Sequence, residues 1–205
     1  MCLIMLKTCV CVLTNAATLP DIEADVIGVD KGAWFCHQKG IPMKIALGDF
    51  DSITETEKSL LEKACDSMIV LNPRKDVSDS EAAVLWAKEN GYERIVLVTS
   101  MSGRFDHSYV NFRLVEKYDC ELWDQQNHVC LIKEGTTTVQ KDGYRYISFF
   151  AVEQATVTLS GFSYDLNEHL LDSHTVLCLS NEIVHDTATV KTTAKLWCIQ
   201  SNDKN

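Results

Sequence analysis

The chain has 205 residues, enough for one large domain or two small ones with a real hydrophobic core. Apolar residues make up 46% of it and charged residues 23%, which excludes a disordered, collagen-like or low-complexity protein. Its 29 acidic residues outnumber the 19 basic ones, and the formal net charge is -10. This surplus argues against nucleic-acid or anionic-membrane partners, because both bind positive potential.

Nine cysteines are spread along the chain without a Cys-x-x-Cys motif. This pattern predicts reduced thiols in a cytoplasmic protein rather than a disulfide framework or a thiolate metal site. The apolar opening at 1–13 lacks a basic leader and contains Lys7, so we expect a first buried strand rather than a signal peptide. No apolar stretch reaches the length of about 18 residues that a membrane-spanning helix needs, so we expect a soluble protein.

Residues 1–126 alternate short apolar runs with amphipathic segments, which predicts a doubly wound α/β domain with a mostly parallel sheet. We expect strands at 8–13, 26–29, 45–47, 68–71 and 95–99, and helices at 54–64, 78–90 and 106–118. Local signals mark the helix ends: capping boxes at Thr54 with Glu57 and at Ser78 with Glu81, and a stop at Asn90-Gly91.

Residues 127–205 lose the helical periodicity, which predicts a small all-β, antiparallel, sandwich-like domain. We expect strands at 144–152, 155–159, 175–179, 187–191 and 195–200, and a turn at Lys141-Asp142-Gly143. We place the domain boundary within 124–134, since no Pro-rich or Ser-rich linker marks it.

Aspartates follow the predicted strands of the first domain, at the sheet edge where open α/β folds bind ligands. They are Asp30, Asp49, Asp51, Asp79 and Asp106. Gathered carboxylates repel one another unless a cation fills the space, and such hard oxygen ligands suit Mg²⁺ with substrate phosphates completing its shell. Purely local roles are the alternative: helix caps at Asp79 and Asp106, and a turn at Asp51-Ser52.

Cations and glycines are interleaved with these aspartates, namely Lys31, Arg74, Lys75 and Arg104, with Gly32, Gly48 and Gly103. Basic side chains beside Mg²⁺-binding carboxylates are typical of a nucleoside-triphosphate site. The sequence contains neither the P-loop motif nor the Gly-x-Gly-x-x-Gly motif of dinucleotide folds. The residues alone therefore predict a Mg²⁺-dependent enzyme that acts on phosphates.

Six motifs in chain order resemble the thiamine pyrophosphokinase family. They are Asp30-Lys31-Gly32-Ala33, Gly48-Asp49-Phe50-Asp51-Ser52, Lys75-Asp76-Val77-Ser78-Asp79-Ser80-Glu81-Ala82, Gly103-Arg104-Phe105-Asp106-His107, Gly161-Phe162-Ser163-Tyr164-Asp165-Leu166 and Ser180-Asn181-Glu182. Asn111 and the closing Leu196-Trp197 add to the likeness. The motifs span nearly the whole chain and agree with the two predicted domains.

The resemblance implies transfer of a pyrophosphoryl group from ATP to the hydroxyethyl group of thiamine, which releases AMP. It implies that 1–126 binds ATP and Mg²⁺, that 127–205 binds thiamine, and that a cytoplasmic homodimer holds thiamine between its subunits. The implied catalytic residues are Asp49, Asp51, Asp79, Arg104 and Asp106, of which the first three hold the metal. The implied ATP-binding residues are Asn15, Asp30, Lys31, Gly32, Lys75, Arg104 and His107, and the implied thiamine-binding residues are Ser180, Asn181 and Asp79. Either Asp51 or Asp79 would accept the hydroxyl proton.

The chain departs from the family pattern at three positions. Ala16 and Ser102 stand where the family commonly has glycine near the phosphates. Ile183 stands where many members carry an aromatic residue that stacks on thiamine, a contact worth roughly 1–3 kcal/mol for bases in nucleic-acid systems. Trp197 or Tyr164 would have to replace that ring.

Three other functions compete with this one. The same metal cluster could serve a pyrophosphokinase for another small alcohol such as a pterin. A non-catalytic module could bind thiamine diphosphate or nucleotide, although all five aspartates are present. A carboxylate-metal hydrolase would use water in place of the alcohol.

Overall fold

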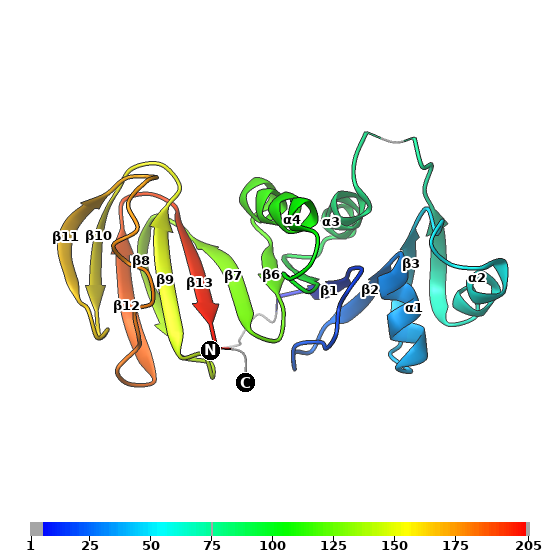
Figure 1. Cartoon of the computed structure of the whole chain (residues 1–205), viewed down its shortest axis with the longest axis horizontal. Helices are drawn as coiled ribbons and strands as arrows, with labels where there is room; N and C mark the ends of the chain where they lie inside the picture. Colours follow the sequence, from blue (N-terminus) through cyan, green and yellow to red (C-terminus); the bar gives the residue numbers. More distant parts are fainter. Residues whose placement is uncertain (1–5, 75, 204–205) are drawn as a thin grey trace. The chain divides into compact units, whose positions relative to one another are not determined.

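The computed structural model describes residues 6–74 and 76–203, which fall into two compact units, Met1–Gln125 and Gln126–Asn205. Figure 1 shows the first unit in blue to green and the second in green to red. An α/β unit precedes an all-β antiparallel unit, which confirms the predicted fold class.

Six strands form the sheet of the first unit, in the order β4-β3-β2-β1-β5-β6, and every neighbouring pair is parallel. Their bounds are β1 (Thr8–Val12), β2 (Asp25–Val29), β3 (Met43–Gly48), β4 (Cys65–Val70), β5 (Arg94–Val98) and β6 (Glu121–Trp123). The central strands are apolar on both faces because helices cover the sheet. Four consecutive residues of β1, from Cys9 to Val12, are buried. Residues 1–5 of the predicted apolar opening lie outside the described residues.

Four helices connect these strands: α1 (Lys31–Gln38), α2 (Glu55–Leu61), α3 (Asp79–Glu89) and α4 (Phe105–Tyr118). In Figure 1, α3 and α4 lie next to each other, as do α1 and α2. The last three match the predicted helices, and α3 ends at Asn90 with Gly91 at a φ of 76°. The sequence did not predict α1 or β6. Helix α1 is short, Asp30 gives it no side-chain cap, and it contains a glycine. None of the described helices is long and apolar enough to span a membrane.

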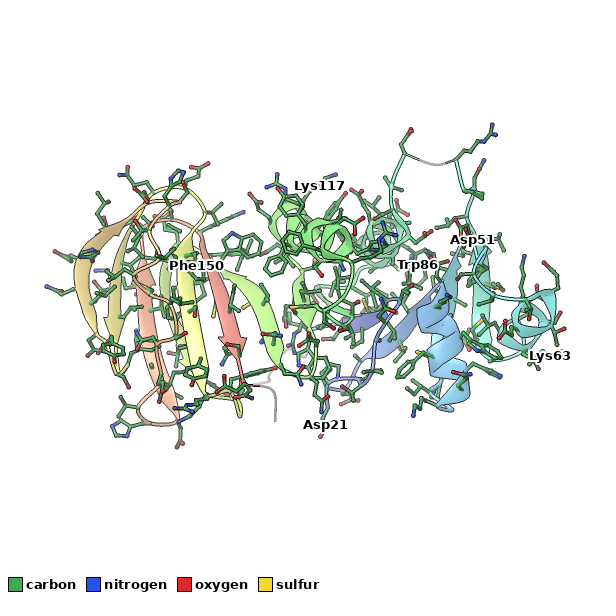
Figure 2. The ribbon with its side chains drawn as sticks, in the orientation of Figure 1. Asp21, Asp51, Lys63, Trp86, Lys117 and Phe150 are labelled. Carbon is green, nitrogen blue, oxygen red and sulfur yellow. The ribbon has the colours of Figure 1, made fainter. Side chains whose placement is uncertain are left out.

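The two predicted capping boxes have different outcomes. The box at Thr54 is complete, because Thr54 and Glu57 exchange side-chain-to-backbone hydrogen bonds. At the start of α3 only half of the box forms: Ser78 Oγ accepts from the Glu81 N–H at 3.1 Å. The Glu81 carboxylate instead accepts from Lys117 Nζ of α4 at 2.8 Å, so a contact between helices replaces the second half. Lys117 is labelled in Figure 2.

Gly32, in the first turn of α1, is buried against the end of β1. A Cβ atom there would stand 1.9 Å from the Val12 carbonyl oxygen. We therefore expect Gly32→Ala to lower the free energy of unfolding by about 3 kcal/mol or more, measured by urea denaturation. Gly40→Ala is the control, because Gly40 has a φ of 65° but no neighbour within 4 Å. It should cost roughly 1–2 kcal/mol, and equal losses in the two variants would contradict the steric explanation.

The second unit contains two antiparallel sheets, β7-β13-β9 and β11-β10-β12-β8. The bounds are β7 (Asn127–Ile132), β8 (Gly135–Gln140), β9 (Tyr146–Ala151), β10 (Ala155–Ser160), β11 (Leu166–Leu171), β12 (Thr187–Thr192) and β13 (Leu196–Ser201). Apolar side chains from both sheets form one core, in which Phe149 meets Phe162 edge-on at 5.6 Å between ring centroids.

One predicted strand of this unit is wrong. Residues 175–179 form turns rather than a strand, with the Leu179 N–H bonded to the Val176 carbonyl at 3.3 Å. The run of apolar residues suggested a strand, but Val176, Leu177 and Leu179 are exposed and only Cys178 packs in the core. Strands β7, β8 and β11 were not predicted. The exposed positions of β8 and β11 are mostly polar or glycine, which hides the strand pattern. The predicted turn at Lys141-Asp142-Gly143 is confirmed, with the Tyr144 N–H bonded to the Lys141 carbonyl at 2.9 Å.

Candidate active site

A pocket of about 260 Å³ opens at the carboxyl ends of β1, β2 and β5. The strand order runs from β1 to β4 on one side and from β5 to β6 on the other, so β1 and β5 mark the point where the winding reverses. Ligands of open α/β sheets bind at such a point. The pocket is walled by the loops after these three strands and by the first turns of α3 and α4.

Three aspartates gather beside this pocket. Asp30 follows β2, Asp49 follows β3 and Asp79 begins α3, and one carboxylate oxygen from each lies within 4.8 Å of the other two. Asp30 and Asp79 also line the pocket. Asp51, labelled in Figure 2, is exposed, and its N–H donates to Asp49 Oδ1 at 3.2 Å. Among the described residues, the cluster of close carboxylates thus consists of Asp30, Asp49 and Asp79. The sequence predicted Asp51 in the place that Asp30 takes.

The backbone around Asp30 is shaped to present its carboxylate. Asp30 has φ 48° and ψ -122°, a strained conformation for a non-glycine residue that costs about 1–3 kcal/mol. Its N–H donates to the Leu47 carbonyl at 3.0 Å, and its Oδ1 accepts from the Phe50 N–H at 3.3 Å. Gly48 allows this approach, since a Cβ there would stand 2.0 Å from Asp30 Oδ1. Strain held in place by neighbouring strands is typical of a functional position.

Burial and the neighbouring carboxylates both act on the pKa of Asp30. Burial, followed by the negative charge of Asp79, raises the pKa of Asp30 to about 7, although the Phe50 N–H acts in the opposite direction. Asp49 adds a smaller repulsion. A bound cation would favour the charged form of all three carboxylates, and oxygen-only ligands match the preference of Mg²⁺. The residues present therefore fit a hard divalent cation.

This raised pKa makes the stability of the metal-free protein depend on pH. Between about pH 4 and pH 7 the native state holds a proton on Asp30 that the unfolded chain releases. The contribution of Asp30 to the free energy of unfolding should therefore fall as pH rises through that window and level off above it. Urea denaturation in chelator at several pH values measures this. Asp30→Asn should remove this part of the pH dependence, and an unchanged profile in that variant would contradict it.

Arg104 and Asp106 form an exposed ion pair at the start of α4. Arg104 Nε donates to Asp106 Oδ1 at 3.1 Å and Nη2 donates to Oδ2, and this contact holds the pKa of Asp106 below its usual range. Arg104 lines the pocket. Its guanidinium has five N–H groups, so donors remain for a ligand. Asp79 and Asp106 are not the N-cap residues of their helices, as the alternative interpretation had it. The N-cap residue is Ser78 in α3 and Arg104 in α4.

The other predicted nucleotide residues divide into three groups. Asn15, at a φ of 69°, and His107 both line the pocket. Lys31 is exposed at the start of α1 and is not among the pocket residues, and Gly32 packs against β1. Lys75 lies outside the described residues.

Sequence reasoning missed the hydroxyl groups of the pocket. Thr14, Ser80, Ser100 and Ser108 all line it. The sequence held a signal for Asn111, another residue that lines the pocket. Asn111 is four residues after His107 on α4, so the two share one face of the helix. Serine and threonine after strand ends are too common to stand out in a single sequence.

The predicted thiamine residues of the second unit lie just before β12. Ser180 is exposed, has a φ of 54°, and its N–H donates to Ser148 Oγ at 2.9 Å. Asn181 is only 2% exposed. Its Oδ1 accepts from the Tyr164 N–H at 3.0 Å and its Nδ2 donates to the Tyr164 carbonyl at 2.8 Å. The amide of Asn181 thus holds the loop that carries Tyr164.

Ile183 also has a different setting from the one expected. Its side chain is 3% exposed and belongs to the core of the second unit, where its backbone bridges to Phe162. A residue at this position points into the core rather than onto a ligand-binding surface of this unit. Trp197 is half-buried on β13, whereas Tyr164 is 72% exposed. Of the two rings considered as substitutes, Tyr164 is therefore the accessible one.

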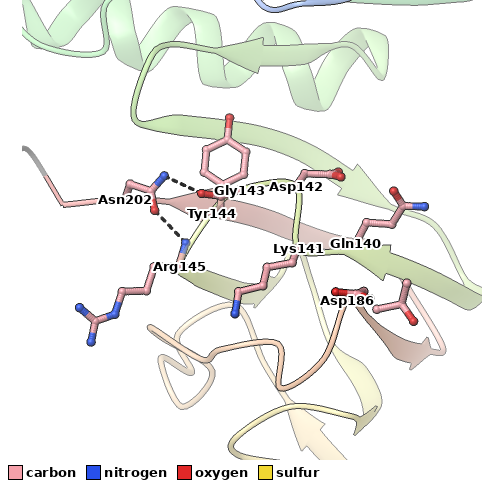
Figure 3. Close-up of a pocket in the computed structure, with 9 residues that line it drawn as sticks. Gln140, Lys141, Asp142, Gly143, Tyr144, Arg145, Asp186 and Asn202 are labelled. Carbon is pink, nitrogen blue, oxygen red and sulfur yellow. Dashed lines mark hydrogen bonds between the residues drawn. The ribbon is translucent and has the colours of Figure 1, made fainter.

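A second hollow, of about 760 Å³, lies in the second unit around the turn that joins β8 to β9 (Figure 3). Asn202 closes one side of it, because its side chain accepts from the Arg145 N–H at 2.8 Å and donates to the Gly143 carbonyl at 3.1 Å. None of the predicted site residues lines it. Its size alone does not connect it with the aspartate cluster.

The chain is similar to known proteins along most of its length. Residues 21–141 match the family described as thiamin pyrophosphokinase, catalytic domain, and residues 136–197 match thiamin pyrophosphokinase, vitamin B1 binding domain. A thiamine pyrophosphokinase of Bacillus subtilis is 38% identical over 171 residues, which cover 80% of each chain.

Solved structures give the same result. The crystal structure of thiamine pyrophosphokinase from Bacillus subtilis has a TM-score of 0.86 and 33% identity, and the match covers 97% of this chain and 100% of that one. The thiamin pyrophosphokinase from Geobacillus thermodenitrificans has a TM-score of 0.82 and 30% identity, with coverage of 96% and 99%.

Proposed function

The chain belongs to the thiamine pyrophosphokinase family of ATP-dependent transferases, and from this premise we propose that it pyrophosphorylates thiamine. In the proposed reaction the hydroxyethyl oxygen of thiamine attacks the β-phosphorus of ATP. A new oxygen–phosphorus bond forms, the bond from the β-phosphorus to the AMP oxygen breaks, and the hydroxyl proton passes to a base. The observation that carries this proposal is the cluster of Asp30, Asp49 and Asp79 beside the pocket. This pocket lies where the winding of the parallel sheet reverses, between β1 and β5.

The proposed metal is Mg²⁺, held by Asp49 and Asp79 as predicted and by Asp30 in addition. The mutual approach of the three carboxylates supports this assignment, as does the raised pKa of Asp30. When bound, Mg²⁺ would neutralise charge on the transferring phosphates. Asp51 keeps its predicted catalytic role as a proposal, either as an outer metal-site residue or as the proton acceptor. Asp79 is the other candidate acceptor, and it lines the pocket.

The chain's remaining contribution is to position ATP and to bind its phosphates. Arg104 would contact phosphate through the N–H groups that Asp106 leaves available, so Asp106 acts as a positioning residue for that guanidinium. Asn15 and His107, which both line the pocket, would contact the nucleotide. Three further residues complete the proposed ATP-binding set: Lys31, Gly32 and Lys75. Among them Gly32 acts through the packing of α1.

We assign ATP binding and catalysis to 1–126 and thiamine binding to 127–205, in a cytoplasmic homodimer with thiamine between the subunits. In this proposal Ser180 contacts thiamine, and Asn181 acts by fixing the loop of the exposed Tyr164. The dimer is supported by the segment before Ser180, in which Val176, Leu177 and Leu179 are 67%, 56% and 61% exposed. Such exposed apolar groups are typical of an interaction surface.

One incubation tests the proposed function. The protein is mixed with MgCl₂, ATP and thiamine, and the products are separated by chromatography. We expect AMP and thiamine diphosphate in equal amounts. Formation of ADP, or release of phosphate without consumption of thiamine, would overturn the proposal. A pterin alcohol in place of thiamine is the control for acceptor identity, and it should give no AMP.

A further inference from the structure

Two cysteines face each other across neighbouring strands in the second unit. Cys130 of β7 and Cys198 of β13 are direct partners in an antiparallel pair. Of the described cysteines in strands, these two alone are paired with another cysteine across a ladder. The eight described cysteines all carry thiols in this structure.

The register places these two residues close enough for a bond. One residue beyond the Ser201–Asn127 end of this ladder, the Asn202 N–H donates to the Gln126 carbonyl at 2.9 Å, so Asn202 and Gln126 form a hydrogen-bonded pair. Because hydrogen-bonded pairs recur at every second residue, Cys130 and Cys198 also form such a pair. Their Cα atoms then lie about 5.5 Å apart, within the range of roughly 4.4–6.8 Å that disulfides span.

The two thiols share one environment but differ in access. Cys198 is 3% exposed, and Cys130 is half-buried against the same core. A hydrogen bond with the Cys130 thiol, together with burial, raises the pKa of Cys198. The sulfurs are therefore adjacent, and Cys130 is the one that a reagent from solution reaches first.

We propose that Cys130 and Cys198 form a reversible disulfide when the protein meets a low-molecular-weight disulfide. The Cys130 thiolate attacks one sulfur of the reagent, whose sulfur–sulfur bond breaks to release one thiolate and leave a mixed disulfide. The Cys198 thiolate then attacks the Cys130 sulfur and releases the second reagent thiolate. Two protein thiols are thereby oxidised by two electrons, the reagent is reduced to two thiols, and the two protons leave with them.

Strand geometry makes this bond easy to reverse. In a hydrogen-bonded pair the Cβ atoms lie towards the far end of the range of roughly 4.5–5.5 Å, whereas a disulfide needs about 3.5–4.5 Å. Closure therefore pulls the strands together and strains the bond. Strained disulfides are more readily reduced than structural ones. The pair is accordingly a reversible modification site rather than a permanent link.

The test uses the full folded chain with oxidised glutathione. After acid quenching and alkylation, peptide mass spectrometry maps the modified cysteines. We expect one cross-linked peptide pair that contains Cys130 and Cys198, with a loss of two hydrogen atoms, and its complete reversal by dithiothreitol. Mapping of a different pair as the main product, or a stable glutathione adduct in the wild-type chain, would overturn the proposal, as would no reaction at all.

Variants separate the two steps. Cys198→Ser should stop at one glutathione adduct on Cys130, and Cys130→Ser should form neither adduct nor cross-link in this unit. Cys178→Ser is the matched control, since Cys178 is 4% exposed in the same core and should leave the cross-link unchanged. Loss of the cross-link in this control would show that core disruption, not pairing, explains the other two results. The peptide mapping of the wild-type chain tests the proposal even if a variant fails to fold.

Discussion

Asp79→Asn should lower kcat for thiamine diphosphate formation by roughly a hundredfold or more while the protein stays folded. The substitution keeps the size and shape of the side chain, replaces one acceptor oxygen by an NH2 donor, and removes one negative charge from the cluster of Asp30, Asp49 and Asp79. That charge attracts the cation and repels Asp30, so its removal weakens Mg²⁺ binding and returns the pKa of Asp30 towards its ordinary value. Initial rates across MgCl₂ concentrations measure the first effect, and NMR titration of Asp30 measures the second.

Asp49→Asn and Asp51→Asn form the matched comparison for this prediction. Asp49 belongs to the close group, whereas Asp51 is exposed and outside it. If the structural grouping describes the metal site, Asp49→Asn should raise the MgCl₂ concentration needed for half-maximal rate. Asp51→Asn should lower kcat through proton transfer with little change in that concentration. If Asp51→Asn raises the half-maximal MgCl₂ concentration more than Asp49→Asn does, Asp51 belongs to the metal ligands, as the sequence predicted. Wild-type turnover in Asp79→Asn would remove Asp79 from the site.

The fold was predictable where burial dictates the sequence pattern. Strands buried on both faces read as apolar runs, as β1 and β5 do, and strong caps such as Thr54 with Glu57 mark helix starts. Prediction failed where one face meets solvent. Strand β8, with the sequence GTTTVQ, has too few apolar residues. The segment 175–179 has many, but all of them except Cys178 are exposed. A single sequence does not distinguish an apolar side chain in a core from one kept for a partner.

The candidate site was predictable in its chemistry and only partly in its grouping. Carboxylates at the ends of parallel strands meet at one sheet edge, which explains why the sequence predicts Asp30, Asp49 and Asp79 in one set. The implied metal set contained Asp51 instead of Asp30. The close approach of Asp30 depends on a strained backbone and on the missing side chain at Gly48, and neither leaves a periodic signal. Asn181 stays a prediction as a thiamine-binding residue, and the structure adds a second use for it. Its place in a motif predicted contact with the ligand, and its amide hydrogen-bonds the Tyr164 backbone, which no sequence pattern indicated.

Leu177→Glu should convert the proposed homodimer into monomers and lower activity by roughly a hundredfold or more, because a buried unpaired charge costs several kcal/mol at an interface. Leu177 is 56% exposed in the turn segment that precedes Ser180, so the folded unit can accept a carboxylate there without loss of core packing. Sedimentation velocity gives the oligomeric state, and the AMP assay gives the rate. Leu60→Glu is the control on α2, where Leu60 is 41% exposed, and it should change neither quantity. If thiamine binds between subunits, activity of the Leu177 variant should recover at protein concentrations that restore the dimer. A fully active monomer would instead place the whole thiamine site within one chain, and the exposed segment would then need another explanation.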